Sequence, residues 1–209
     1  MSGHRLTNTD CVHAGTGPCD VRHAVTTAIV HSAPFTFAST REVLDFVEGR
    51  SGRTQPEYGR MGNPTLTRVQ ERLAAIEGAE RAQLFASGMA AVTTTMLACL
   101  EPGDHLVLTS DCYKRTREFG GTFLGRFGVE TSVVAPTTDA VAEALRPETR
   151  MVLVEVPSNP YQYVVDIERL AGLGRERGIL TVVDGTFATP VNLRPLEWGA
   201  HLVIHSATK

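Results

Sequence analysis

Short apolar runs alternate with helix-like segments along most of the chain from Pro64 onward. In the helix-like segments the apolar residues recur every three or four positions, whereas the short runs have the length of strands. Strands are predicted at residues 82–86, 106–108, 131–134, 151–156, 180–183 and 202–204, and helices at residues 64–77, 87–100, 117–127, 139–145 and 167–177. Because a helix between two strands allows a crossover connection, this order predicts an α/β fold with a mainly parallel sheet.

The first of these helices has recognisable ends. Asn63 is a suitable N-cap residue, Pro64 suits the first helical position and Gly78 suits the end. The residues that recur at helical spacing between them are Leu66, Val69, Leu73 and Ile76. This spacing predicts a helix that buries one face.

The first 60 or so residues lack this alternation. They contain loop-forming runs such as Gly15-Thr16-Gly17-Pro18 and Arg50-Ser51-Gly52-Arg53. We therefore expect residues 1–60 to form an N-terminal arm and residues 61–209 to form the large domain. An arm needs a surface to lie on, and a neighbouring subunit is a natural candidate.

The composition is typical of a soluble globular chain. Of the 209 residues, 42% are hydrophobic and 21% are charged, which allows a sizeable core and argues against disorder. The net charge is -3 and the basic residues are scattered among acidic ones, so no positive face for nucleic acid is expected. No run approaches the ~18 apolar residues of a membrane span, and polar residues follow Met1 in place of a signal-peptide core. The expected location is cytoplasmic, without a membrane or nucleic-acid partner.

The cysteines carry no signature of a disulfide framework or a metal site. Cys11, Cys19, Cys99 and Cys112 form no C-x-x-C pair and show no ligand spacing with the seven histidines. We therefore expect free thiols and no bound metal.

Polar residues follow the last two predicted strands. Asp184-Gly185-Thr186 comes after one strand, and Ser206-Ala207-Thr208-Lys209 comes after the other. Open α/β sheets bind ligands beyond the carboxyl ends of their strands. A carboxylate, an amine and hydroxyls at this edge suit pyridoxal phosphate, because they match its pyridine nitrogen, its aldehyde and its phosphate. Taken alone, the last four residues would be a solvated chain end, but the upstream run favours a cofactor site.

A second polar turn suits the phosphate group. Ser87 and Gly88 stand between a predicted strand and a predicted helix, where a glycine allows close approach and the helix start carries partial positive charge. An ordinary N-cap is the alternative interpretation of this turn.

Six motifs occur in order along the chain: residues 58–65, 87–89, 111–113, 155–160, 184–190 and 205–209. In this order they resemble the Cys/Met metabolism pyridoxal phosphate enzymes, which include cystathionine gamma-synthase, cystathionine and methionine lyases and the homoserine sulfhydrylases. The match runs from about Val12 to Lys209. It implies the large domain of the aspartate aminotransferase-like fold, known as fold type I, and a chain that stops before the family's C-terminal domain.

The resemblance implies a role for each catalytic position. Lys209 would bind the cofactor aldehyde, release it to the substrate amine and then move protons between substrate carbons. Asp184 would keep the pyridine nitrogen protonated through a charge-assisted contact. Tyr113 would stack on the cofactor ring with its hydroxyl near the leaving group, and core packing is the alternative for this residue.

The same resemblance implies contacts to the cofactor phosphate. Those within one subunit would come from Gly88, Met89, Ser206 and Thr208. Tyr58 and Arg60 would reach the phosphate in a neighbour's site, a task that suits the planar fork of an arginine. The implied assembly is a homo-oligomer, a dimer of dimers, with sites shared between subunits.

Two residues at or just beyond the carboxyl end of the fourth predicted strand have alternative interpretations. Asn159 would form a hydrogen bond near the ring oxygen of the cofactor, but an Asn before Pro160 also suits an ordinary turn. Glu155 is either a site residue or a solvated strand end.

Within the family, the loop at residues 111–117 and Gly185 in place of the usual Asn look most like plant-type cystathionine gamma-synthases. The implied reaction is gamma replacement, in which an activated homoserine loses its gamma substituent and accepts the sulfur of cysteine. Cystathionine or methionine gamma-lyase and homoserine sulfhydrylase activities are alternatives with similar loops.

Two further interpretations belong to other classes. The family's C-terminal domain supplies an arginine for the substrate carboxylate, and no residue here can be assigned that role, so we expect little turnover from the 209 residues alone. An inactive fragment that associates with full-length subunits is one alternative. A nucleotide-binding Rossmann module is the other, although no G-x-G-x-x-G follows the first strand.

Overall fold

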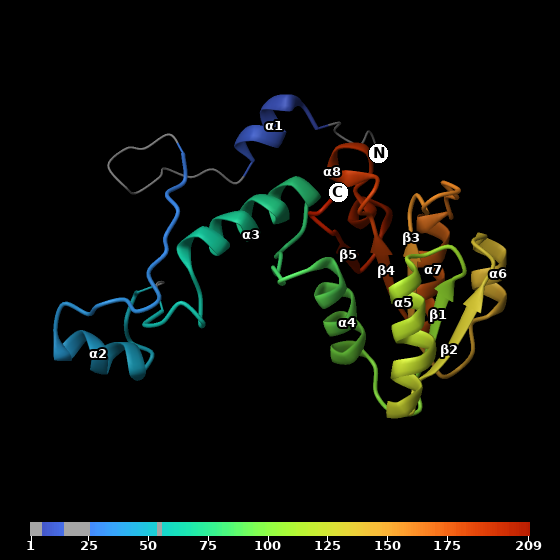
Figure 1. The fold of residues 1–209 in the computed structure, drawn as a ribbon, viewed down its shortest axis with the longest axis horizontal. Coiled ribbons are helices and arrows are strands. Elements are labelled where there is room, and N and C mark those ends of the chain that lie inside the picture. Colours follow the sequence, from blue (N-terminus) through green and yellow to red (C-terminus); the bar gives the residue numbers. More distant parts are fainter. Residues whose placement is uncertain (1–5, 15–25, 54–55) are drawn as a thin grey trace. The chain divides into compact units, whose positions relative to one another are not determined.

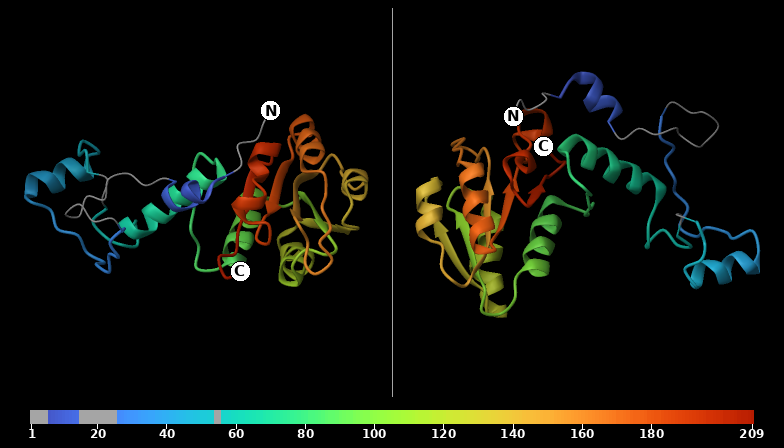
Figure 2. Two further views of the ribbon diagram at one scale, coloured as in Figure 1. Left: turned by 90° about the horizontal axis from the view of Figure 1, so that it is seen from above. Right: turned by 180° about the vertical axis from the view of Figure 1, so that it is seen from behind.

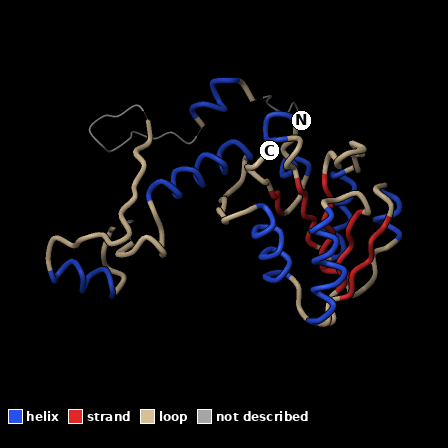
Figure 3. The backbone as a smooth tube through the Cα atoms, viewed as in Figure 1, coloured by secondary structure: helices blue, strands red, loops and turns tan. Residues whose placement is uncertain are grey.

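The computed structural model describes residues 6–14, 26–53 and 56–209, which fall into two units. One unit comprises Thr7–Leu84, and the other comprises Phe85–Lys209 together with Leu6. Every strand of the sheet belongs to the second unit (Figure 3). Within the described residues, every helix falls short of the length and apolar content that a bilayer span requires.

The second unit is built on a five-stranded sheet in the order β2-β1-β3-β4-β5 (Figure 1). All neighbouring strands pair in parallel, so the predicted parallel α/β fold is confirmed. The strands are β1 (His105–Thr109), β2 (Glu130–Val134), β3 (Thr149–Glu155), β4 (Leu180–Asp184) and β5 (Leu202–Ile204).

Helices cover both faces of this sheet (Figure 2). One face packs against α4 (Gly88–Cys99) and the helical run that follows β1, and the other packs against α6 (Thr138–Glu143) and α7 (Ile167–Arg177). The run after β1 is longer than predicted, because it already begins at Lys114. It consists of α5 (Lys114–Glu118), the π-helical η1 (Phe119–Phe123) and the 3-10 helix η2 (Leu124–Phe127). Two short elements precede β5, namely α8 (Thr189–Asn192) and η3 (Pro195–Trp198).

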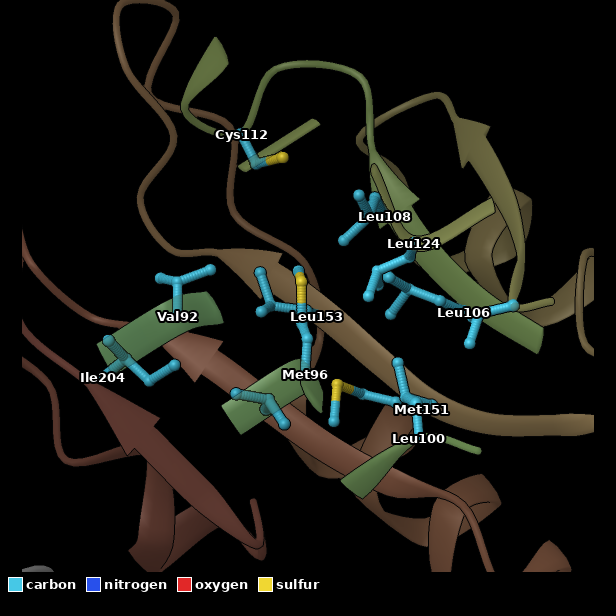
Figure 4. Close-up of a cluster of buried hydrophobic side chains, with 12 residues drawn as sticks. Val92, Met96, Leu100, Leu106, Leu108, Cys112, Leu124, Met151, Leu153 and Ile204 are labelled. Atoms are coloured by element: carbon cyan, nitrogen blue, oxygen red, sulfur yellow. The ribbon is translucent and has the colours of Figure 1, made fainter. Parts of the chain in front are cut away.

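The apolar core explains how the strands are oriented. Successive strand residues point to opposite faces, so Met151 and Leu153 of β3 pack on the α4 side whereas Val152 and Val154 pack on the α7 side. Figure 4 shows the first of these clusters, with Met96 of α4 against the strand residues. The α4-side row of β3 continues from Met151 and Leu153 to Glu155. The same row of β4 continues from Val182 to Asp184. β3 and β4 thus each end in a carboxyl group on the α4 side of the sheet.

The first unit contains three helices among its described residues: α1 (Asn8–His13), α2 (Thr40–Val47) and α3 (Pro64–Glu77). The predicted ends of α3 are confirmed. The side chain of Asn63 accepts the N–H of Thr65 at 2.8 Å, and Gly78 has a left-handed φ of 68°. The structure also contains α1 and α2, which the sequence interpretation did not anticipate.

One strand prediction is wrong. Residues 82–86 form no strand, although their side chains alternate in exposure, because no described segment pairs with them.

The run at residues 50–53 has no helix or strand, as expected for a loop, and the run at residues 15–18 lies outside the described residues. Cys11, Cys99 and Cys112 are free thiols, and Cys19 lies outside the described residues.

Candidate active site

A cavity of about 1010 Å³ lies at the carboxyl ends of the parallel strands. This is where an open α/β sheet is expected to bind a ligand. The predicted site residues that line it are Gly88, Met89, Tyr113, Asn159, Asp184, Ser206, Thr208 and Lys209. The structure therefore brings together all the predicted site residues of the second unit, including the carboxylate and the amine that were expected at the two ends of a cofactor.

Asp184 is held in place by Thr186. Oδ1 of Asp184 accepts the backbone N–H of Thr186 at 3.0 Å and its hydroxyl at 2.5 Å. The same hydroxyl oxygen accepts the backbone N–H of Ser206 at 2.9 Å. Thr186 thus links the residue that ends β4 to the turn that follows β5. Thr186 stands in the same D-G-T run as Asp184, but the sequence alone does not indicate this role for its side chain.

The start of α4 meets the turn at Ser206. The hydroxyl of Ser87 accepts the N–H of Ala90 at 3.0 Å and caps the helix, so the capping interpretation of this turn holds. A Cβ atom on Gly88 would lie 2.6 Å from the Cβ of Ser206 and 2.7 Å from its Oγ. Only a glycine allows this approach, which places a hydroxyl against the partly positive end of the helix. Such an arrangement favours an anion.

Glu155 is a buried residue of this site and not a solvated strand end. Glu155 is 6% exposed, and its Oε2 accepts the backbone N–H of Tyr113 at 2.8 Å. Burial, and after it the charge of Asp184, raises the pKa of the Glu155 carboxyl to about 7. Glu155 is therefore able to gain or lose a proton near neutral pH.

The loop after β1 presents two side chains with different surroundings. Tyr113 is 55% exposed at the cavity wall, so the alternative of core packing is wrong. Cys112 is buried, and burial raises the pKa of its thiol to about 12. A thiol with this pKa stays protonated at neutral pH and is a poor nucleophile.

Tyr58 and Arg60 lie in the first unit, whereas the residues that line the cavity all belong to the second. The guanidinium of Arg60 lies over the ring of Tyr58, 5.0 Å from its centroid. Tyr58 pairs with Pro34 in an antiparallel bridge, and the N–H of Gly59 donates to the carbonyl of Ala33 at 2.6 Å. These contacts fix the two side chains next to each other at one place on the first unit, and their role in a neighbour's site stays a prediction.

The cavity fits pyridoxal phosphate in its chemistry. It has a carboxylate at Asp184, an amine at Lys209, and a capped helix start next to the hydroxyl of Ser206. The close approach at Gly88 supports the fit, because this is where the backbone must come near a phosphate group.

Comparisons with known proteins agree with this chemistry. The chain is 44% identical over 202 residues to cystathionine gamma-synthase 1, chloroplastic, of Arabidopsis thaliana, covering 95% of this chain and 36% of that protein. It is 38% identical to the cystathionine beta-lyase MetC of Bacillus subtilis (strain 168), covering 100% of this chain and 51% of the relative. The crystal structure of metB from Corynebacterium glutamicum superimposes with a TM-score of 0.85 at 38% identity, covering 96% of this chain and 50% of that one. The chain thus spans about half the length of these relatives or less.

A family model supplies the assignment. The model for Cys/Met metabolism PLP-dependent enzymes matches residues 8–209, which is nearly the whole chain. The chain belongs to the Cys/Met metabolism PLP-dependent enzyme family.

Proposed function

We propose that the protein catalyses a gamma replacement of the cystathionine gamma-synthase type, in which cysteine sulfur displaces the gamma substituent of an activated homoserine. The observation that carries the proposal is that Asp184, Lys209 and the glycine start of α4 line one cavity. The 44% identity to the Arabidopsis cystathionine gamma-synthase supports replacement as the reaction. The 38% identity to the Bacillus beta-lyase makes elimination the second candidate.

Each side chain would have a separate task in this reaction. The bound cofactor would draw off the electrons released when the alpha proton of the substrate leaves. Lys209 would hold and return that proton, because its amine lines the same cavity. Asp184, oriented by Thr186, would accept a hydrogen bond from the ring nitrogen.

The phosphate would be held where the start of α4 meets the turn after β5. The backbone N–H groups of Gly88 and Met89 stand in the first turn of α4, where they have no partner within the helix. The hydroxyls of Ser206 and Thr208 would complete this set, and Asn159 would contact the ring oxygen.

The assembly is part of the proposal. We infer a homo-oligomer in which residues 1–60 contact a neighbouring subunit and in which Tyr58 and Arg60 complete that neighbour's phosphate site. The observation in support is that Arg60 lies over the exposed ring of Tyr58, with its guanidinium available to a phosphate.

The test has two stages. First, the protein is incubated with pyridoxal phosphate and reduced with borohydride, and peptide mapping is expected to find the cofactor on Lys209 and none in the variant Lys209→Ala. Second, O-phosphohomoserine or an O-acylhomoserine is added with cysteine, and mass spectrometry is expected to find cystathionine. If no cystathionine forms and a keto acid appears, from this mixture or from cystathionine added as the substrate, the reaction is elimination, and no cofactor on Lys209 would contradict the whole proposal. The expectation of slow turnover by the 209 residues alone is tested in the same assay.

A further inference from the structure

Glu155 connects two of the loops that form the cavity. It ends β3, and its Oε2 accepts the backbone N–H of Tyr113, which lies in the loop after β1. Because β1 and β3 are neighbours in the sheet, this contact ties the ends of two adjacent strands together. The contact uses only the backbone of Tyr113 and leaves its exposed ring free to face a ligand.

Glu155 also lies beside Asp184. The two residues are paired in register across β3 and β4, at the end of the two rows that face α4. Adjacent strands are about 4.8 Å apart, so the two carboxyl groups emerge side by side on the same face of the sheet. Two carboxylates in such a position resist carrying a charge at the same time.

The surroundings of the two carboxyls differ. Asp184 accepts two hydrogen bonds from Thr186. Glu155 is buried, and burial followed by the charge of Asp184 raises its pKa to about 7, with a smaller contribution from Asp111 in the same direction. The N–H groups of Tyr113 and Asn159 act in the opposite direction. The thiol of Cys112 also faces this group, and the charge of Glu155 raises its pKa further.

We propose that Glu155 is a positioning residue of the active site, which holds the Tyr113 loop at the strand end beside Asp184. This inference rests on the proposed function, in which Tyr113 and Asp184 contact the same cofactor. Glu155 itself touches neither the substrate nor the reacting atoms in this scheme. It acts through the residues at the ends of the neighbouring strands.

Hydrogen exchange of the Tyr113 amide tests the contact without any cofactor. Glu155→Ala removes the acceptor, so exchange of this amide should become about tenfold faster. Glu155→Gln keeps an acceptor oxygen without a charge and should protect the amide nearly as well as the wild type at about pH 6. At about pH 8 the ionised wild-type carboxylate is the stronger acceptor, so the wild type should then protect the amide better than Glu155→Gln. The exposed Glu148, at the other end of β3, supplies the control Glu148→Gln, which should match the wild type.

Cofactor affinity is the second measurement. At about pH 6, Glu155→Ala should bind pyridoxal phosphate about tenfold more weakly, whereas Glu155→Gln should stay within about threefold of the wild type. Equal exchange of the Tyr113 amide in all variants would overturn the proposal, and so would a Glu155→Gln variant as impaired as Glu155→Ala. If the wild type binds no pyridoxal phosphate, the proposed function fails, and the exchange measurement alone then decides whether Glu155 positions the loop.

Discussion

Gly88 and Ser206 approach each other so closely that a Cβ atom on Gly88 would lie 2.6 Å from the Cβ of Ser206. The Cα of Ser206 would be 3.1 Å away, so rotation of the serine side chain alone cannot relieve the contact. The turn after β5 and the start of α4 are therefore packed against each other through a position that only glycine can occupy.

We expect Gly88→Ala to disturb this contact and weaken cofactor binding. Either the helix start or the Ser206 turn must shift, which costs about 1–3 kcal/mol for an overpacked site. Pyridoxal phosphate should then bind about tenfold more weakly or worse. Titration of the cofactor absorbance measures the affinity. Gly172→Ala is a matched control, because an added Cβ there meets nothing within 4 Å in the interior of α7. Equal affinities of both variants would contradict the packing argument.

The hydroxyl of Thr186 leads to a second prediction. Thr186→Val keeps the shape of the side chain but removes the donor to Asp184 and the acceptor for the N–H of Ser206. Asp184 keeps the backbone N–H of residue 186 but loses the hydroxyl, and the N–H of Ser206 loses its acceptor, which should lower the free energy of unfolding by about 1–3 kcal/mol and weaken cofactor binding. Urea unfolding and cofactor titration measure the two effects. Thr186→Ser retains the hydroxyl and should restore most of the affinity, and a valine variant with wild-type values would show that the link is unimportant.

Much of this architecture was predictable because its signals are local. The strands of the sheet are short apolar runs, and their alternation with helices fixes the parallel order of the connections. The polar residues of the site follow strand ends, so placing the strands also places Asp184 and the residues from Ser206 onward at one edge. These residues can therefore be identified from the sequence without their contacts.

The predictions that were wrong or left open concern residues whose structure depends on a partner elsewhere in the chain. Residues 82–86 have a strand-like pattern, but a strand requires a neighbour for its backbone groups, and a pattern cannot supply one. For Glu155, the choice between a solvated end and a buried site depended on the loop that carries Tyr113, which is 42 residues away in sequence. Helix α2 is different, because the sequence contains a local signal for it. Ser39 caps the helix, and Glu42 accepts the N–H of Ala38, so the N-terminal end of α2 could have been predicted.

The pH dependence of stability should contain a contribution from His105. This residue is 1% exposed at the start of β1, and its ring lies between the hydroxyls of Thr149 and Ser132, at 2.8 Å and 2.9 Å. Burial, followed by the charge of Arg146, lowers the pKa of the ring. The unfolded chain then binds a proton at a higher pH than the folded chain does. This contribution to stability is therefore fully present above about pH 6.5 and is lost as the pH falls below that value.

Urea unfolding at about pH 7.5 and about pH 5.5 measures this contribution. Glu155, with its raised pKa, contributes with the opposite sign, so the informative quantity is the difference between the wild type and His105→Gln at each pH. The wild type should lose more stability on acidification than the variant does. The exposed His31 supplies the control His31→Gln, which should keep the wild-type dependence. A His105→Gln variant with an unchanged pH dependence would show that the ring does not titrate differently in the folded chain.

Met96 allows a direct test of the core between α4 and the sheet. Its side chain is 0% exposed, and it packs in the cluster that includes Leu153 and Met151 of β3 (Figure 4). Met96→Ala leaves a cavity that these neighbours only partly fill, so the free energy of unfolding should fall by about 2–5 kcal/mol. Leu97 is the next residue on the same helix and is 50% exposed, so Leu97→Ala should change stability by about 0.5 kcal/mol or less. Urea unfolding compares the stabilities of the two variants.

Because α4 also carries Gly88 at its start, Met96→Ala should weaken cofactor binding as well, whereas Leu97→Ala should not. Equal losses of stability in the two variants would mean that α4 does not pack on the sheet through the face that contains Met96.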